Sequence, residues 1–99
     1  MPVQHIALFR FHPGTPPDTV DQALADLHRL AKVIPGIVSF TAGTNSSPEG
    51  LSDGLTHGFA MTFTDATARD AYLPHPEHER FKSFVLPHTA KVVVFDYEF

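Results

Sequence analysis

The chain of 99 residues carries a formal net charge of −4 at pH 7 and has an isoelectric point near 5.9. Its seven Lys and Arg residues are scattered, which excludes nucleic acid and an anionic membrane as partners. The length suits one domain over residues 1–99, and no cationic and apolar leader opens the sequence, so we expect a cytoplasmic protein. Cysteine is absent, which excludes disulfides, thiolate metal sites and cysteine nucleophiles, whereas histidine occurs seven times.

The first half of the chain predicts a strand, a helix and a second strand. Residues 3–11 are rich in β-branched and aromatic residues that alternate in the manner of a strand. Thr15 is expected to cap a helix whose apolar residues recur at helical spacing and which stops at Pro35-Gly36. Residues 37–43 predict the second strand. The polar, glycine-containing residues 44–54 predict a long loop of the kind that binds ligands or moves.

The second half predicts two more strands separated by an interrupted helix. Residues 55–64 alternate cleanly, and residues 91–99 predict the last strand. Between them a short helix should end near Tyr72, because the residues before Pro74 and Pro76 are pushed toward extended backbone. A second helical segment should begin at Pro76, since proline suits the first turn of a helix.

The order of predicted elements is β-α-β-β-α-β, the ferredoxin-like arrangement of an α+β domain. It implies a four-stranded antiparallel sheet with both helices on one face and water on the other. However, Ile6 and Leu8 oppose Ala7 and Phe9 on the first strand, and the last strand is also apolar on both faces. A second copy of the chain is the simplest cover for the extra apolar face. We therefore predict a homodimer whose two sheets pack face to face.

The strongest candidate site is the stretch of residues 72–78, which places a phenol and two imidazoles beside the proline break. His78 shares a helical face with Phe81 and Val85, so its side chain should point toward the core. In an enzyme, His78 would take a proton from the carbon beside a carbonyl, while the Tyr72 hydroxyl would donate a hydrogen bond to the developing enolate oxygen. Alternatively, Tyr72 and His78 form a hydrogen-bonded core pair that holds the proline break in place.

Three further histidines are weaker candidates. His5 and His57 lie on strand faces shared with phenylalanines, where a hydrogen-bonded core histidine is the usual explanation, and we expect only one of them to border reacting atoms. His75 and His78 could share a metal ion through helical spacing. Pro76 between them and the absence of obvious further ligands argue against this, so no metal site is predicted.

Six short motifs, spread over nearly the whole chain, together resemble one known family. They are His5-Ile6, Ile34-Pro35-Gly36, residues 47–50 (SPEG), residues 56–59 (THGF), residues 72–78 (YLPHPEH) and residues 94–97 (VFDY). The family is that of the stress-responsive A/B barrel (Dabb) domains. The resemblance implies a single Dabb domain, a dimeric α/β barrel, and a small pocket between sheet and helices in each subunit.

One plant member of this family is a polyketide cyclase that performs an intramolecular aldol reaction without metal or organic cofactor. The resemblance assigns catalysis to Tyr72 and His78, favours His5 over His57 at the pocket, and implies no cofactor here. Where the plant enzyme shapes its pocket with bulky aromatic residues, the first helix of this chain offers smaller ones such as Leu27. The expected substrate contacts are His5, His57, His75, Leu27 and Phe59.

Two functions from different classes stay open. The first is a cofactor-free cyclase or lyase-like enzyme that performs aldol-type acid/base chemistry on a small keto or polyketide-like compound. The second is a non-catalytic dimer that binds a small-molecule ligand or confers stress tolerance. Removal of the Tyr72 hydroxyl should separate them, because a catalytic hydroxyl controls turnover and a structural one controls the melting temperature.

Overall fold

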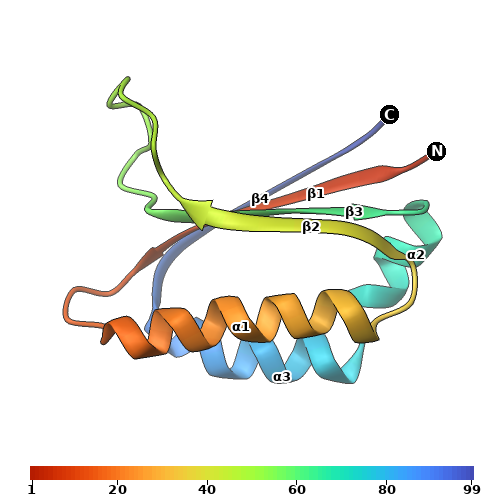
Figure 1. Cartoon of the computed structure of the whole chain (residues 1–99), viewed down its shortest axis with the longest axis horizontal. Helices are drawn as coiled ribbons and strands as arrows, with labels where there is room; N and C mark the ends of the chain where they lie inside the picture. The colour runs from red at the N-terminus through yellow and green to blue at the C-terminus, as the bar shows by residue number, and fades with distance from the viewer.

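Four antiparallel strands form one sheet in the computed structural model, which describes residues 1–99 (Figure 1). The strands are β1 (Val3–Phe11), β2 (Ile37–Thr44), β3 (His57–Phe63) and β4 (Thr89–Glu98). Their order across the sheet is β2-β3-β1-β4, and every neighbouring pair is antiparallel. The predicted fold class, α+β with a ferredoxin-like four-stranded sheet, is confirmed.

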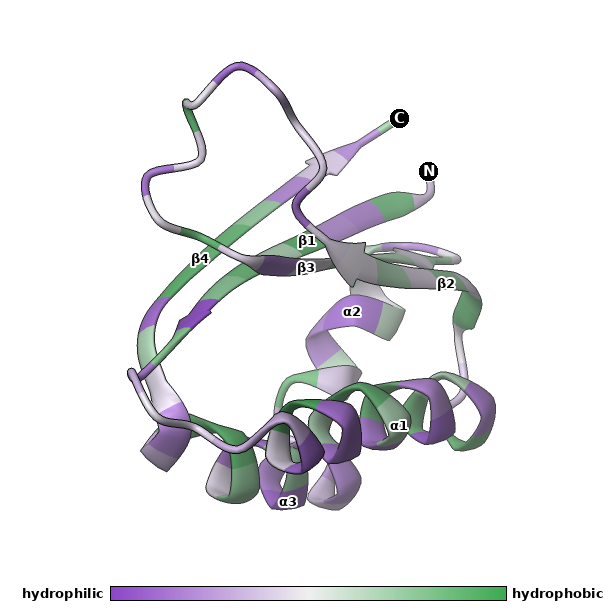
Figure 2. Cartoon of the chain, turned by 60° about the vertical axis from the view of Figure 1, so that its left-hand side comes forward, coloured by the Kyte–Doolittle hydropathy of each residue, from purple (hydrophilic) through white to green (hydrophobic).

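The helices all lie against one face of this sheet (Figure 1). They are α1 (Pro17–Val33), α2 (Ala66–Tyr72) and α3 (Pro76–Val85), and a 3-10 turn (Leu86–His88) leads into β4. Helices α1 and α3 run side by side beneath the sheet, and α2 lies at its end (Figures 1 and 2). No helix has both the length and the apolar character needed to cross a membrane.

Side-chain caps fix the start of α2 and of α3. The Asp65 carboxylate accepts a hydrogen bond of 2.8 Å from the Ala68 N–H, and Nδ1 of His75 accepts one of 3.1 Å from the Glu77 N–H. The first helix ends at Tyr72, as predicted, and His75 before Pro76 has extended backbone (φ −59°, ψ 136°). The prediction of extended backbone at Leu73 is wrong, since Leu73 keeps helical angles (φ −56°, ψ −46°) as the C-cap of α2. The break next to the candidate site is therefore held by its own capping group.

The start of α1 differs from the prediction. Its N-cap is Pro16 rather than Thr15, and no side chain caps the helix. The Thr15 hydroxyl donates instead to the carbonyl of His12 at 2.7 Å, which closes the turn that follows β1. A Thr15 cap would accept from the N–H of residue 17 or 18, and Pro17 has no N–H group, so only the Asp18 N–H could serve as its donor.

The hydrophobic core lies between the sheet and the helices, and every second residue of β1 and β3 faces it. His5 belongs to the core-facing row of β1 and is the one buried polar residue of the chain, 5% exposed. A buried polar side chain requires a partner, so His5 marks the part of the core where polar contacts must occur. The buried apolar members of this core are Val3, Ala7, Phe9, Ala23, Leu27, Leu30, Ile34, Phe59, Met61, Phe63, Tyr72, Phe81 and Val85.

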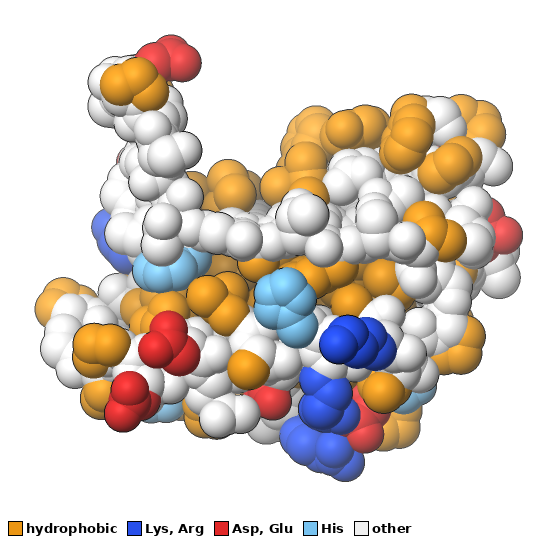
Figure 3. All heavy atoms as spheres, in the orientation of Figure 1, with side chains coloured by type: hydrophobic (Ala, Val, Ile, Leu, Met, Phe, Trp, Pro, Cys, Tyr) orange, Lys and Arg blue, Asp and Glu red, His pale blue; other side chains and the backbone are white.

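The opposite face of the sheet is uncovered and largely apolar over β1 and β4. Strand register pairs Ile6 with Phe95 and Leu8 with Val93, so these four side chains share that face. Phe95 is 63% exposed. Figure 3 shows apolar side chains gathered above the sheet, on the side away from the helices. The prediction that both faces of these two strands are apolar is confirmed.

Candidate functional site

Tyr72, the last residue of α2, is fully buried in the core. Its ring lies between two imidazoles: the His78 ring stacks on it with centroids 4.1 Å apart, and the His5 ring meets it edge-on at 5.8 Å. The Tyr72 hydroxyl is also buried and has no hydrogen-bond partner. Because an unpaired buried hydroxyl lowers stability, it calls for an explanation, and one explanation is a donor aimed at a bound molecule.

His78 lies in the first turn of α3, and its ring is half-buried. Its Nδ1 is 2.9 Å from the carbonyl oxygen of Leu73. A carbonyl only accepts hydrogen bonds, so Nδ1 carries the proton and Nε2 keeps a lone pair. Burial lowers the pKa of His78 below its usual value, and the Leu73 carbonyl opposes this shift only in part. A neutral imidazole with a free Nε2 can act as a general base near neutral pH.

The same burial acts on Tyr72 in the direction that suits a hydrogen-bond donor. Burial raises the pKa of the Tyr72 hydroxyl, so the group stays protonated at physiological pH. The alternative in which Tyr72 and His78 form a hydrogen-bonded pair is wrong, since His78 bonds to Leu73 and the hydroxyl bonds to nothing. The two rings stack instead, which leaves both polar groups available.

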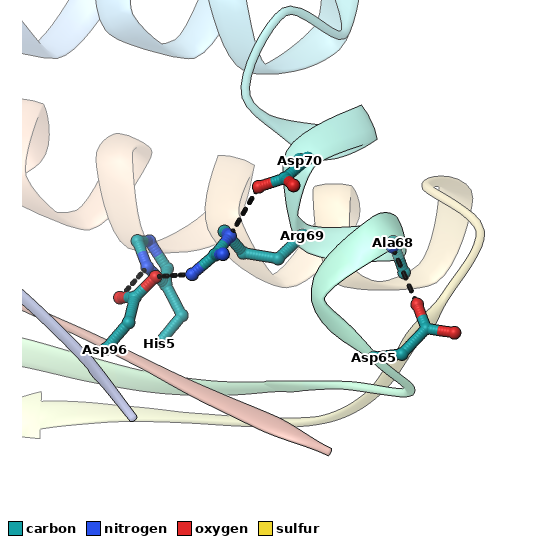
Figure 4. Close-up of polar contacts among 6 residues, drawn as sticks. All are labelled: His5, Asp65, Ala68, Arg69, Asp70 and Asp96. Atoms are coloured by element: carbon teal, nitrogen blue, oxygen red, sulfur yellow. Dashed lines mark hydrogen bonds and ion pairs between the residues drawn. The ribbon is translucent and has the colours of Figure 1, made fainter. Parts of the chain in front are cut away.

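A chain of charged groups reaches His5 from outside the core (Figure 4). Nδ1 of His5 lies 2.7 Å from Oδ1 of Asp96, its neighbour in the β1–β4 register. Arg69 of α2 donates through Nη1 to the second oxygen of Asp96 at 2.8 Å, and through Nε to Asp70 at 2.8 Å. The network ties β1, β4 and α2 together beside Tyr72.

Asp96 and Arg69 were not predicted from the sequence as residues of the site. Asp96 is 91 residues from His5 along the chain, so only the strand pairing brings the two together. One signal was available. In β4, Asp96 alternates with Val92 and Val94, which places a carboxylate in a row that faces the helix side of the sheet.

Three of the predicted substrate contacts, Leu27, His57 and Phe59, line a small cavity between the sheet, α1 and α3. Its volume is about 10 Å³, which suffices for one water molecule at most. Its walls are otherwise apolar and include Phe81 and Val85. This cavity lies between the sheet and the helices, where the resemblance implied a pocket, but its own side chains nearly fill it. None of Tyr72, His78 and His5 lines it.

The other predicted contacts have different surroundings. His5 packs against Tyr72, whereas register places His57 four residues further along the sheet, where its Nδ1 lies 2.8 Å from the Thr56 hydroxyl. His5 thus contacts Tyr72, but His57 and not His5 lines the small cavity, so the preference for His5 at the pocket is wrong. His75 uses Nδ1 to cap α3, so its ring serves the helix start.

A cleft of about 650 Å³ lies on the other side of the sheet. It is lined by residues of the sheet and of the long loop that joins β2 to β3, such as Leu8 and Leu51. Figure 2 shows this loop rising from the sheet on the side away from the helices. Neither Tyr72 nor His78 lines it, and it opens on the uncovered apolar face. The volume of a cleft therefore does not indicate where Tyr72 and His78 lie.

Comparison with known proteins gives consistent results along the whole chain. The family model described as "Stress responsive A/B Barrel Domain" (Dabb) matches residues 3–99. A curated relative, the stress-response A/B barrel domain-containing protein HS1 of Arabidopsis thaliana, is 33% identical over 97 residues. That alignment covers 98% of this chain and 89% of the relative.

Two solved structures are also closely similar. A hydroxynitrile lyase from Passiflora edulis superposes with a TM-score of 0.90 at 28% identity, over 97% of this chain and 91% of the lyase. A dimeric ferredoxin-like protein from Jannaschia sp. CCS1 superposes with a TM-score of 0.90 at 30% identity, over 100% of both chains.

Proposed function

Because this chain belongs to the stress-responsive A/B barrel (Dabb) family, we propose that it is a cofactor-free enzyme of the aldol or lyase type that acts on a small carbonyl compound. One observation carries the proposal: the buried Tyr72 hydroxyl has no partner and its ring stacks on a neutral His78. The similarity to a hydroxynitrile lyase supports the same class of chemistry.

The proposed step is removal of a proton from the carbon beside the carbonyl. Nε2 of His78 accepts this proton, and the electron pair moves onto the carbonyl oxygen to form an enolate. The Tyr72 hydroxyl donates a hydrogen bond to that oxygen, where charge develops in a site of low polarity. The enolate can then attack a second carbonyl, or the reverse sequence can cleave a carbon–carbon bond.

The size of the inner cavity restricts the substrate. A cavity of about 10 Å³ has no room for several carbon atoms, so a substrate that approached Tyr72 and His78 through it would have to displace Leu27 and Phe81. A compound of a few carbon atoms requires less movement than a long polyketide. We therefore propose a small keto compound as the substrate.

Deuterium exchange tests this proposal without knowledge of the complete reaction. The protein would be incubated in D₂O with a series of methyl ketones that begins with 2-butanone, and NMR would follow deuterium incorporation beside the carbonyl. We expect exchange above the buffer rate, lost in His78→Gln and kept in His28→Gln, whose side chain is exposed on α1. Exchange at the buffer rate for the wild-type protein across the ketone series would contradict the proposal.

The second candidate function is a non-catalytic dimer that binds a ligand or acts in stress tolerance. The nearly filled cavity favours it, as does the stress-response description of the relative HS1. Under this proposal neither Tyr72 nor His78 would affect the chemistry of any added carbonyl compound. The exchange experiment therefore separates the two functions.

We also propose that the chain forms a homodimer through the uncovered face of its sheet. The similar Jannaschia protein is dimeric. Leu8, Phe95 and Tyr97 are exposed on a continuous apolar surface of β1 and β4, which a second copy would remove from water. The interface would leave the core site on the other face of each sheet.

A further inference from the structure

We propose that Asp96 and Arg69 preset His5 as a hydrogen-bond acceptor, so that the core site selects compounds that carry a hydroxyl group as well as a carbonyl oxygen. This inference rests on the proposed function and names its substrate class. It concerns His5, which the mechanism above does not use, and two residues that reach it from β4 and α2.

The Asp96 carboxylate determines which nitrogen of His5 carries the proton. Its two oxygens contact different groups: Oδ1 lies 2.7 Å from Nδ1 of His5, and Oδ2 accepts from Arg69. A guanidinium never accepts a hydrogen bond, so its contact keeps the carboxylate an acceptor on both sides. Nδ1 of His5 must then be the donor, and in the neutral imidazole Nε2 keeps its lone pair.

Nε2 of His5 has no hydrogen-bond partner in the protein, and aromatic rings surround the imidazole. The two nitrogens lie on different sides of the ring, so Nε2 is turned away from Asp96. The neighbouring rings are those of Phe59, Phe63 and Tyr72, with centroids 5.6, 6.1 and 5.8 Å away. No protein group donates to Nε2 of His5. The Tyr72 hydroxyl is the one fully buried side-chain polar atom without a partner, so the unpaired Nε2 keeps some access from outside the core.

The two unpaired groups, one donor and one acceptor, indicate which hydrogen-bonding groups a ligand of this site should carry. The Tyr72 hydroxyl is an unpaired donor, Nε2 of the neutral His5 ring is an unpaired acceptor, and the centroids of the two rings are 5.8 Å apart. A simple ketone supplies an oxygen for Tyr72 and nothing for His5. A β-hydroxy ketone supplies both an acceptor oxygen and a hydroxyl donor, and it is the product of an aldol addition. We therefore assign the hydroxy ketones as the class that the site prefers.

Binding of a matched pair of probes tests this assignment. NMR titration would compare 4-hydroxy-2-butanone with 4-methoxy-2-butanone, which keeps the carbonyl and lacks the hydroxyl proton. We expect the hydroxy compound to bind wild-type protein roughly five- to tenfold more tightly, the effect of one buried hydrogen bond. Asp96→Leu should abolish this preference, and Asp70→Asn should keep it, because Asp70 contacts Arg69 but not Asp96.

A second measurement reports on His5 directly and needs no ligand. Long-range ¹H–¹⁵N correlation spectra distinguish the two neutral histidine tautomers. We expect Nδ1–H for His5 in the wild-type protein and in Asp70→Asn, with a shift toward Nε2–H, the form that free histidine prefers, in Asp96→Leu. An Nε2–H tautomer in the wild type would overturn the inference, and this result does not require the variant to fold.

The outcomes also separate this inference from the proposed function. Equal affinities for the two probes, or failure of both to bind at millimolar concentration, would overturn the inference. A clear preference for the hydroxy compound without any deuterium exchange would uphold the inference and contradict the proposed catalysis. Exchange without the preference would do the reverse.

Discussion

Burial has the same effect on the two residues at the centre of the proposed site. It lowers the pKa of His78 and raises the pKa of Tyr72, so it favours the neutral form of each. His78 as a neutral base and Tyr72 as a neutral hydrogen-bond donor can thus lie next to each other without a buried charge. Charge develops only when a proton moves, which is where a preorganised donor contributes most.

The lowered pKa of His78 gives stability and activity a defined dependence on pH. Because the folded-state value lies below the usual 6.5, the unfolded chain binds a proton more readily, so stability is complete above 6.5 and is lost as pH falls through the folded value. As the pH falls below 6.5, we expect the melting temperature to decrease less in His78→Gln than in the wild-type protein. An unchanged profile would contradict the assignment of a buried, neutral His78.

The boundaries of helices and strands near the site are predicted correctly where they depend on residues that are close together in the sequence. The proline break between α2 and α3 is encoded within seven residues, and its predicted position is correct. The start of α1 was misplaced because the Thr15 hydroxyl has a competing partner in the preceding turn. Strand β3 begins at His57 rather than at residue 55, since Thr56 bonds to Phe9 beyond the regular ladder.

The contacts of His5 depend on elements that are distant in the sequence. A shift of one residue in the β1–β4 register would turn Asp96 to the other face of the sheet. Arg69 must also reach across from α2, which requires the correct packing of that helix. Residue types therefore predict the pair Tyr72 and His78, and only the assembled sheet adds the partner of His5.

The packing of α1 against the sheet sets the size of the inner cavity. Leu27 is fully buried and lines that cavity, so Leu27→Ala should enlarge it and destabilise the protein by about 2–5 kcal/mol. We also expect faster deuterium exchange with larger ketones, because less side-chain movement is then needed. Chemical denaturation and the exchange assay would measure the two effects. A slower exchange rate in a folded variant would show that the substrate does not enter beside Leu27.

The two faces of the sheet differ in the side chains that they present. The helix-covered face holds the titratable groups, and the uncovered face holds exposed apolar side chains and the cleft that the β2–β3 loop lines in part. A chain of this length buries only about 60–65% of its unfolded surface, so a second subunit would add needed stability. Dimerisation and chemistry are thus assigned to opposite faces.

A charge placed on the uncovered face should disrupt the proposed dimer. Phe95→Glu would bury an unpaired carboxylate between the two sheets, so we expect a shift to monomer in sedimentation experiments at micromolar concentration. Leu86→Glu is the control, since Leu86 is exposed on the helical side of the chain. Dimerisation of Phe95→Glu with wild-type affinity would place the interface elsewhere.

The most direct test of the account compares stability and chemistry in Tyr72→Phe. The hydroxyl has no partner, so its removal should leave the free energy of unfolding within about 1 kcal/mol of wild type, or raise it. The same substitution should reduce ketone deuterium exchange by roughly 10²–10³-fold, because the donor to the enolate oxygen is lost. A variant that exchanges at the wild-type rate, or one that loses stability by several kcal/mol, would contradict the catalytic assignment of Tyr72.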